Sequence, residues 1–199
     1  GIYSASESWP LNEQSAIDPD SRHAGKAQTE SWLRQQGIPF TSFRPTYIYG
    51  PGNYNPIERW FFDRIVNDRP IPLPSDGSTI TQLGHVVDLA EAMSRSLEVE
   101  AATNRIYNCS SKLGITFRGL IAAAAKACGK EPNAVEVRSF DPSGLDPKAR
   151  KAFPLRLSHF FTDITRAERE LAWHPSFDLE TGLADSYIND YIVKPTAQP

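Results

Sequence analysis

The sequence predicts an α/β protein in which parallel strands alternate with helices. A polar stretch at residues 18–36 carries helix start signals and ends at Gly37. A short apolar run at residues 38–43 follows, and Gly50-Pro51-Gly52 closes the extended segment with turn residues. Helix, strand and Gly/Pro loop in this order form the ending of a crossover unit. In open α/β sheets, ligands bind beyond the carboxyl ends of the strands, so we expect binding or chemistry at this loop.

Composition sets the broad class. The chain has 199 residues, of which 40% are apolar and 11% aromatic, enough for a real core in one large domain or one and a half small ones. The net charge of −3 does not indicate a polyanion partner for the whole chain, so a nucleic-acid surface would have to be a local patch. We expect Cys109 and Cys128 to be buried free thiols. No run approaches the roughly 18 apolar residues of a membrane helix, so no membrane partner is expected.

The remaining elements follow from local signals. Residues 1–6 look like the tail of a strand, which suggests that the chain is the C-terminal portion of a longer protein. Asp88 is expected to cap a helix, Thr116 to cap another, and residues 142–154 to form a charged loop. Further helices are expected at 57–67, 88–98, 116–129, 163–171 and 179–192, and strands at 79–86, 105–109 and 135–137, with a frayed tail after Lys194.

Six motifs in a fixed order resemble one superfamily. They are Lys26-x-x-x-Glu30, Arg44-Pro45-x-x-x-Tyr49-Gly50-Pro51-Gly52, Asp76-Gly77, His85-Val86-x-Asp88-x-Ala90, Ile106-Tyr107-Asn108 and Ala167-x-x-x-Leu171-x-Trp173-x-Pro175. Together they resemble the extended short-chain dehydrogenases/reductases, the nucleotide-sugar epimerases and dehydratases. The resemblance implies a Rossmann-type doubly wound sheet, of which this chain holds the C-terminal part, with a smaller α/β substrate-side domain. The dinucleotide fingerprint Gly-x-Gly-x-x-Gly is absent, so NAD(P) binding is expected only with an N-terminal half of roughly 100 residues or more.

The catalytic positions depart from that superfamily. Its enzymes use Tyr-x-x-x-Lys, in which the tyrosinate exchanges a proton during hydride transfer and the lysine lowers the tyrosine pKa. Here Lys26 keeps the lysine position, but Arg22 takes the tyrosine position. Arginine stays protonated in proteins, so it cannot act as that base. His23 titrates near neutrality but should point elsewhere on the helix, as an ordinary surface residue. Lys26 could also form a plain surface pair with Glu30.

The sugar-nucleotide contacts are changed as well. Tyr47 stands where nucleotide-sugar enzymes commonly have Asn. Thr81-Gln82-Leu83 stands where they commonly have Arg-Asp-Phe, so the Arg that grips the diphosphate is missing. Arg156, in the region of a second phosphate-binding Arg, remains. The resemblance assigns Lys26, Pro45 and Tyr47 to any surviving cofactor site.

A narrower resemblance fits these changes. Residues 52–62, 82–90 and 151–161 look like the chloroplast stem-loop-binding protein family, atypical superfamily members of chloroplasts and cyanobacteria. That family is associated with RNA binding, divalent-metal-dependent RNA cleavage and ribosome or transcription complexes. It implies a location in the chloroplast stroma or the cyanobacterial cytoplasm. The sequence certifies no metal ligand spacing.

Candidate RNA contacts come from one dense basic run and nearby aromatics. Lys148, Lys151 and Arg156 are expected to contact phosphates, with Arg150 in the same run, although a solvated loop face is the default for such a run. His159 and Phe160 suit phosphate and base contacts or a packed loop equally well. Tyr54 and Trp60 could stack on bases, whereas Phe61 is expected in the core.

Three function classes remain open from the sequence. The first is an RNA-binding protein with a degenerate redox site. It includes, as a further alternative, RNA cleavage that depends on a divalent metal. The second is a working NAD(P)-dependent epimerase, dehydratase or reductase with a substitute acid such as His23 or Tyr47. The third is a scaffold that forms homo-oligomers through the Trp60 helix. In each case residues 1–49 and 85–112 are expected to finish the Rossmann-type domain, and residues 50–84 and 113–199 to form the smaller domain.

Overall fold

The computed structural model describes residues 1–193. The helices are α1 (Ala24–Gln35), α2 (Ile57–Val66), α3 (Val86–Ser96), α4 (Phe117–Ala127), α5 (Pro147–Lys151), α6 (Thr165–Glu170) and α7 (Leu179–Ser186). The strands are β1 (Thr41–Pro45), β2 (Tyr47–Tyr49), β3 (Ile71–Pro74), β4 (Ile80–Thr81), β5 (Leu83–His85), β6 (Arg105–Cys109), β7 (Ile115–Thr116) and β8 (Val137–Phe140). Single turns η1 (Glu100–Ala102) and η2 (Pro132–Ala134) and a π-helical turn η3 (Tyr187–Tyr191) complete the described elements.

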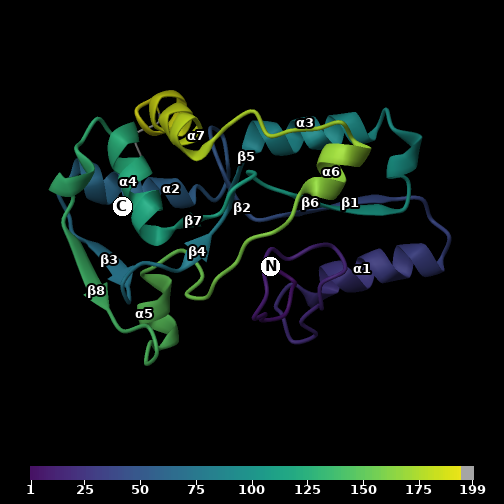
Figure 1. Ribbon diagram of the computed structural model, residues 1–199, viewed down its shortest axis with the longest axis horizontal. Coiled ribbons are helices and arrows are strands. Elements are labelled where there is room, and N and C mark those ends of the chain that lie inside the picture. The colour runs from purple at the N-terminus through teal and green to yellow at the C-terminus, as the bar shows by residue number, and fades with distance from the viewer. Residues whose placement is uncertain (194–199) are drawn as a thin grey trace.

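Parallel pairing dominates the strands. β1 pairs with β6, β2 with β5 and β3 with β8, all parallel, whereas β4 and β7 pair antiparallel. Helix α3 lies in the long connection between β1 and β6, after β5 and shortly before β6. Figure 1 shows α3 and α1 on opposite sides of the β1–β6 strand pair. A helix between two parallel strands is the crossover unit that the sequence predicts, so the α/β class is confirmed.

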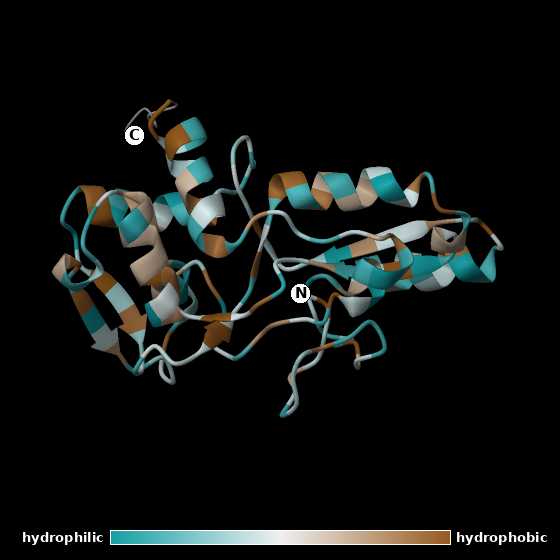
Figure 2. Ribbon diagram, turned by 45° about the horizontal axis from the view of Figure 1, so that its top comes forward, coloured by the Kyte–Doolittle hydropathy of each residue, from teal (hydrophilic) through white to brown (hydrophobic). Residues whose placement is uncertain are grey.

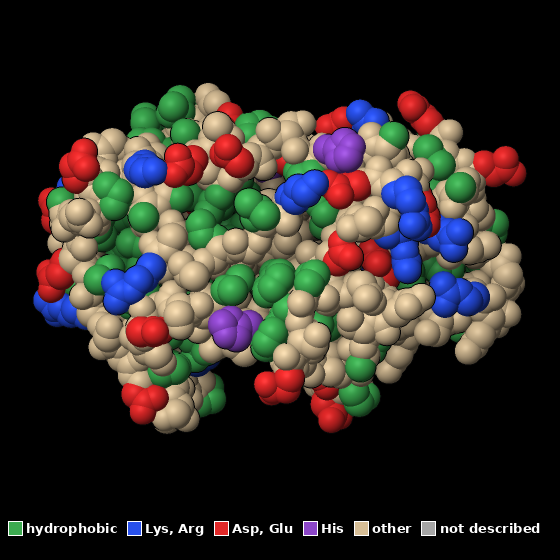
Figure 3. All heavy atoms as spheres, in the orientation of Figure 1, with side chains coloured by type: hydrophobic (Ala, Val, Ile, Leu, Met, Phe, Trp, Pro, Cys, Tyr) green, Lys and Arg blue, Asp and Glu red, His purple; other side chains and the backbone are tan. Residues whose placement is uncertain are grey.

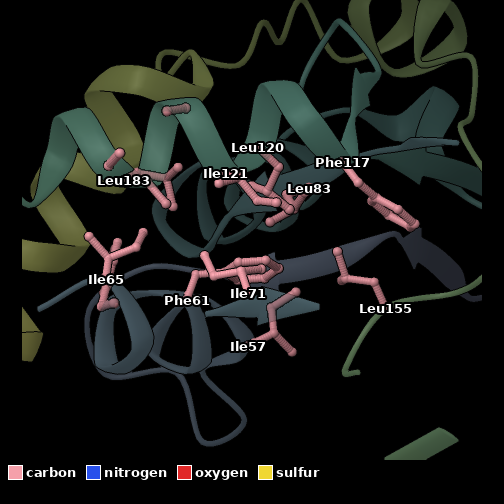
Figure 4. Packing of buried hydrophobic residues seen from close by; sticks show 14 of the residues in the cluster. Ile57, Phe61, Ile65, Ile71, Leu83, Phe117, Leu120, Ile121, Leu155 and Leu183 are labelled. Carbon is pink, nitrogen blue, oxygen red and sulfur yellow. The ribbon is translucent and has the colours of Figure 1, made fainter. Parts of the chain in front are cut away.

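A second core lies around α2, α4 and α7. Figure 4 shows Phe61 and Ile65 of α2 facing Leu120 and Ile121 of α4, with Leu183 of α7 beside them. The apolar positions of α2 recur at helical spacing, so one face of that helix can enter this core. The expected burial of Phe61 is confirmed, since 2% of it is exposed.

Helix α1 contributes differently, because its buried residue is charged. Figure 2 shows α1 as a largely hydrophilic helix, and Glu30 is the residue that it buries. Its face toward the strands is therefore held by polar contacts, which are described below with the site.

The segment with α6 packs against the first strand pair. Ile164, Ala167 and Trp173 share a buried cluster with Tyr107 and Cys109 of β6. The predicted domain boundaries assigned residues 113–199 to the smaller domain, and this packing places 164–173 beside the other one. The boundaries themselves stay a prediction.

Several local expectations were wrong. His85, not Asp88, is the N-cap of α3, and the Asp88 carboxylate instead accepts hydrogen bonds from the backbone N–H groups of Ser176 and Phe177. Among residues 1–6, Tyr3 makes an isolated bridge to Ile17 rather than a strand. Residues 142–154 contain α5, which the sequence analysis did not anticipate.

Other local expectations were confirmed. The Thr116 hydroxyl caps α4, and both cysteines are free, with Cys109 buried and Cys128 partly buried. The expectation for residues after Lys194 lies outside the described residues. Within residues 1–193, no helix is long and apolar enough to cross a membrane.

Candidate functional site

The start of α1 presents three cationic or titratable side chains. Arg22 and Lys26 are exposed, and His23 is partly buried at the N-cap position. The Arg22 Nε–H donates to Nε2 of His23 over 3.0 Å, so His23 contacts Arg22 rather than pointing away from it. Burial and the nearby charges of Arg22, Lys26 and Arg156 lower the His23 pKa, which keeps its imidazole neutral at pH 7.

Lys26 has no ion pair with Glu30. The Glu30 carboxylate is buried and bonds the Arg44 guanidinium on β1 at 2.5 Å, and the Ser42 hydroxyl donates to it at 2.6 Å. The surface pair considered from the i, i+4 spacing is therefore wrong. Lys26 stays available to solvent and ligands, while Glu30 fixes α1 to β1.

Arg156 reaches the same region from the far end of the chain. Its guanidinium lies over the Phe160 ring at 4.6 Å. A Cβ added to Gly1 would lie 2.8 Å from Cζ of Phe160, and the Ser21 hydroxyl donates to the Gly1 carbonyl at 3.1 Å. This chain of contacts, and the charge of Arg156 that acts on His23, place Arg156 near the start of α1. Figure 1 shows the segment that leads from α5 to α6 passing beside the N-terminal end of the chain. We call Arg22, Lys26 and Arg156 the cationic cluster.

Tyr47 borders the cationic cluster. The backbone and the charge of Arg156, together with the charges of Arg150 and Arg22, act to lower the pKa of its hydroxyl. Burial nevertheless raises the Tyr47 pKa above its ordinary value. A phenol that serves as a general base needs a lowered pKa, so Tyr47 is not tuned for that role.

No carboxylate neutralises the cationic cluster among residues 1–193. None of its three members takes part in an ion pair there, and the first turn of α1 carries no acidic residue. Asp18 and Asp20 precede Arg22 in sequence, but the Asp18 carboxylate accepts a hydrogen bond from the Asp20 backbone N–H instead. Three like charges are therefore held together without an acidic partner of their own.

Helix α5 carries a second group of cations. Asp146 caps it by accepting from the N–H groups of Lys148 and Ala149, and Lys148 and Lys151 are both exposed. Arg150 differs, because its guanidinium bonds the carbonyl groups of Phe153 and Leu155. Arg150 therefore holds its own loop together and differs from Lys148 and Lys151, which are free to contact phosphates.

His159 follows Arg156 by three residues and is held in one orientation. The Ile80 backbone N–H donates to its Nδ1 at 3.0 Å, so the neutral ring carries its proton on Nε2. The Trp9 ring lies edge-on to it, with 5.1 Å between centroids. His159 is exposed and thus offers a fixed N–H donor. Trp9 was not predicted as a site residue, because nothing in its local sequence ties it to residue 159.

Gln82 anchors the segment that carries these groups. Its side-chain amide donates to the Ser111 and Thr162 carbonyls at 2.8 and 3.2 Å, and its oxygen accepts from the Thr162 backbone N–H at 2.8 Å. By the resemblance above, Gln82 belongs to the Thr81-Gln82-Leu83 segment that replaces Arg-Asp-Phe of nucleotide-sugar enzymes. Thr81, at the arginine position, and Gln82 are each 1% exposed, so neither side chain can grip a diphosphate.

The two candidate stacking residues behave differently. Tyr54 is 97% exposed, in a loop fixed by hydrogen bonds from the Asn53 amide to the Ile48 and Asn55 carbonyls. Trp60 is partly buried, edge-on to Phe61, with Arg64 over its face at 4.5 Å. Tyr54 therefore offers a free ring, whereas the Trp60 ring is packed against its neighbours and is not free to stack on a base.

The residues present do not fit nicotinamide redox chemistry. The resemblance assigns a ribose contact to Lys26, but Arg22, at the tyrosine position, cannot exchange the proton that hydride transfer requires. The gap that Pro45 lines together with Ile48, His85 and Trp173 is too narrow for a water molecule. Within residues 1–193, no group of three His, Cys, Asp or Glu side chains could hold a metal ion.

Fold and sequence together define the class of protein. The chain belongs to the NAD-dependent epimerase/dehydratase family, with residues 12–110 matching that family. A UDP-N-acetylglucosamine 4-epimerase from Methanobrevibacter ruminantium has a similar structure, with a TM-score of 0.78 and 20% identity over 97% of this chain and 60% of that one. A UDP-glucose 4-epimerase from Thermotoga maritima gives a TM-score of 0.74 and 21% identity over 93% and 58%. These similarities confirm the Rossmann-type fold.

A curated relative with higher sequence identity narrows the family further. The chain is 48% identical to the chloroplast stem-loop binding protein of 41 kDa b from Arabidopsis thaliana, over 96% of this chain and 50% of that protein. GDP-L-fucose synthase of Escherichia coli is 28% identical over 89% of this chain and 56% of its own length. The resemblance to the chloroplast stem-loop-binding proteins is thereby confirmed. The chain spans about half the length of these curated relatives.

Proposed function

We propose that this protein binds RNA through the cationic cluster and α5. The observation that carries the proposal is the meeting of Arg22, Lys26 and Arg156 without a carboxylate partner, at the position of a catalytic phenol in the enzymes of this family. Lys148 and Lys151 add two exposed charges in the same 148–156 run. Cations without acidic partners are what a phosphate backbone neutralises, and they supply most of nonspecific RNA affinity.

Hydrogen-bond donors and rings complete this surface. His159 offers a fixed Nε2–H group beside Trp9, and Tyr54 offers an exposed ring. Single-stranded loops are recognised by stacking and by hydrogen bonds to unpaired bases. A stem-loop, whose name appears in the 48% identical relative, combines such a loop with a phosphate-rich stem.

The positive charge proposed to bind RNA is confined to one part of the surface. On the face shown in Figure 3, Lys and Arg side chains are interspersed with Asp and Glu, in keeping with the net charge of −3. The lower outline in that view is notched between the part that carries α5 and the N-terminal segment. We infer that RNA enters along this side, where the 152–160 segment joins the two groups of cations.

The rival function, an NAD(P)-dependent nucleotide-sugar enzyme, lacks its proton relay. Arg22 is permanently charged, burial raises the pKa of Tyr47, and the His23 lone pair is engaged by Arg22. Turnover of a nucleotide sugar by the purified protein would favour this rival.

The remaining parts of the proposal do not come from the structure. The relative's name gives the chloroplast location, whereas the cyanobacterial cytoplasm and ribosome association are implied by the family resemblance stated above. The homo-oligomeric state is the scaffold hypothesis for the Trp60 helix. Metal-dependent endoribonuclease activity belongs with these remaining parts, and we limit the structural proposal to binding. The same RNA incubated with Mg²⁺ and then with EDTA measures cleavage independently.

Fluorescence anisotropy with a labelled stem-loop RNA tests the proposal. Five phosphate contacts give a slope of log K against log salt of about −3.5, so affinity should fall about 100-fold between 50 and 200 mM salt. The double variant Lys148→Gln/Lys151→Gln should reduce the slope by about 1.4. The matched control Lys126→Gln/Arg95→Gln changes the net charge equally on α4 and α3, and should leave binding unchanged. Binding that is absent, or that ignores salt, would reject the proposal.

A further inference from the structure

The three side chains of the cationic cluster gather around one place instead of lying in a row. Arg22 lies in the turn just before His23, the N-cap of α1, and Lys26 lies in the first turn of that helix. Arg156 joins them through the contacts of Ser21, Gly1 and Phe160 described above. The charges of all three act on one side chain, His23. A backbone groove would instead spread its cations along the strand, one for each successive phosphate.

Each guanidinium of the cluster is braced by a neutral group that leaves N–H donors free. His23 accepts from the Arg22 Nε–H, and no hydrogen bond of the Arg22 terminal nitrogens is found within residues 1–193. Arg156 is braced by the face of the Phe160 ring. A guanidinium held in this way presents a planar fork, the geometry that matches phosphate oxygens.

Charge decides between the two kinds of phosphate in RNA. An internal phosphodiester carries one negative charge, whereas a terminal phosphate monoester carries about −1.5 to −2 at pH 7. Three cations meeting at one place are matched better by the monoester. Its three terminal oxygens can also accept from more than one donor group at once.

Resting on the proposed RNA-binding function, we propose that the cationic cluster is a site for a dianionic phosphate monoester and that it receives the phosphorylated end of an RNA. Lys148, Lys151 and Tyr54 then contact the body of the RNA. Arg22 is the specificity-determining residue, because the enzymes that this chain resembles have at its position a tyrosine, which carries no positive charge. Free inorganic phosphate could bind the same site through the same contacts as a phosphorylated RNA end. The test below therefore uses separate measurements for the two ligands.

The test compares one RNA sequence with a 5′-hydroxyl, a 5′-phosphate or a 3′-phosphate. We expect a phosphorylated end to bind about tenfold more tightly than the hydroxyl form. Arg22→Gln should abolish this preference while the hydroxyl RNA still binds. The control Lys151→Gln should weaken all three RNAs alike and keep the preference. Inorganic phosphate should compete with the RNA end and so reduce the preference for phosphorylated RNA. Sodium chloride at the same ionic strength is the control and should not reduce that preference.

The outcomes distinguish this inference from the proposed function. Equal affinity for the three RNAs overturns the end-binding site and leaves RNA binding intact. No binding of any RNA overturns the proposed function, and calorimetric titration with inorganic phosphate then decides the site by itself. Phosphate binding that Arg22→Gln removes supports a free-phosphate site. The site is overturned if Arg22→Gln still binds inorganic phosphate. It is also overturned if the unchanged protein binds no phosphate.

Discussion

Replacing Gln82 should destabilise the whole segment that carries the candidate site. The Gln82 side chain is buried and bonds both the N–H and the C=O of Thr162, as well as the Ser111 carbonyl. Thr162 is itself 3% exposed, so water cannot replace these partners. Gln82→Met keeps the shape of the side chain and removes every one of these hydrogen bonds.

The magnitude follows from the groups left without partners. Each buried donor or acceptor that loses its partner costs about 1–3 kcal/mol, and Thr162 loses one of each, so the free energy of unfolding should fall by about 2–6 kcal/mol. Because Thr162 closely follows Arg156 and His159, RNA affinity should fall too, although Gln82 contacts no RNA in our account.

Urea unfolding followed by circular dichroism measures the first effect, and anisotropy under strongly native conditions measures the second. Gln28→Met, on the exposed face of α1, is the matched control and should change stability by less than about 0.5 kcal/mol. A loss below about 1 kcal/mol for Gln82→Met would refute the reasoning that Gln82 anchors this segment.

Three further predictions use other parts of the chain. Burial lowers the pKa of His85 although Asp185 and Asp88 oppose the shift. The unfolded chain therefore binds the extra proton, and the free energy of unfolding should fall as the pH drops below about 6.5. Urea unfolding between pH 7.5 and 5.5 should show a weaker dependence in His85→Gln, and an unchanged profile would contradict this prediction. Burial raises the pKa values of Cys109 and Cys128 to about 12, so native protein at pH 8 should resist iodoacetamide until it is unfolded, and rapid native labelling seen by mass spectrometry would be inconsistent with this burial. Tyr54→Ala should leave thermal stability unchanged and weaken RNA binding about tenfold, whereas Tyr54→Phe should bind normally; equal binding by all three proteins would exclude stacking there.

Regular elements could be predicted from the sequence because their signals are local. The apolar spacing of α2, the Thr116 cap of α4 and the apolar strand β6 each lie within a short window. Asp88 was misplaced as a cap for the opposite reason. Its partners, Ser176 and Phe177, lie almost 90 residues away, and a long-range contact displaced the local preference.

The candidate site was only partly predictable for the same reason. Arg22 and Lys26 came from one motif and Arg156 from another, but nothing in the sequence states that they meet around Phe160. The role of Arg150 could not be foreseen either, because a guanidinium bound to its own loop looks in sequence like any member of a basic run.

Cross-linking of bound RNA to the protein, followed by mass spectrometry, tests the central claim most directly. The account predicts cross-linked peptides that contain Tyr54, the start of α1 or residues 146–160. Cross-links confined to α3, α6 and α7, on the other side of the β1–β6 strand pair or beyond it, would contradict the account.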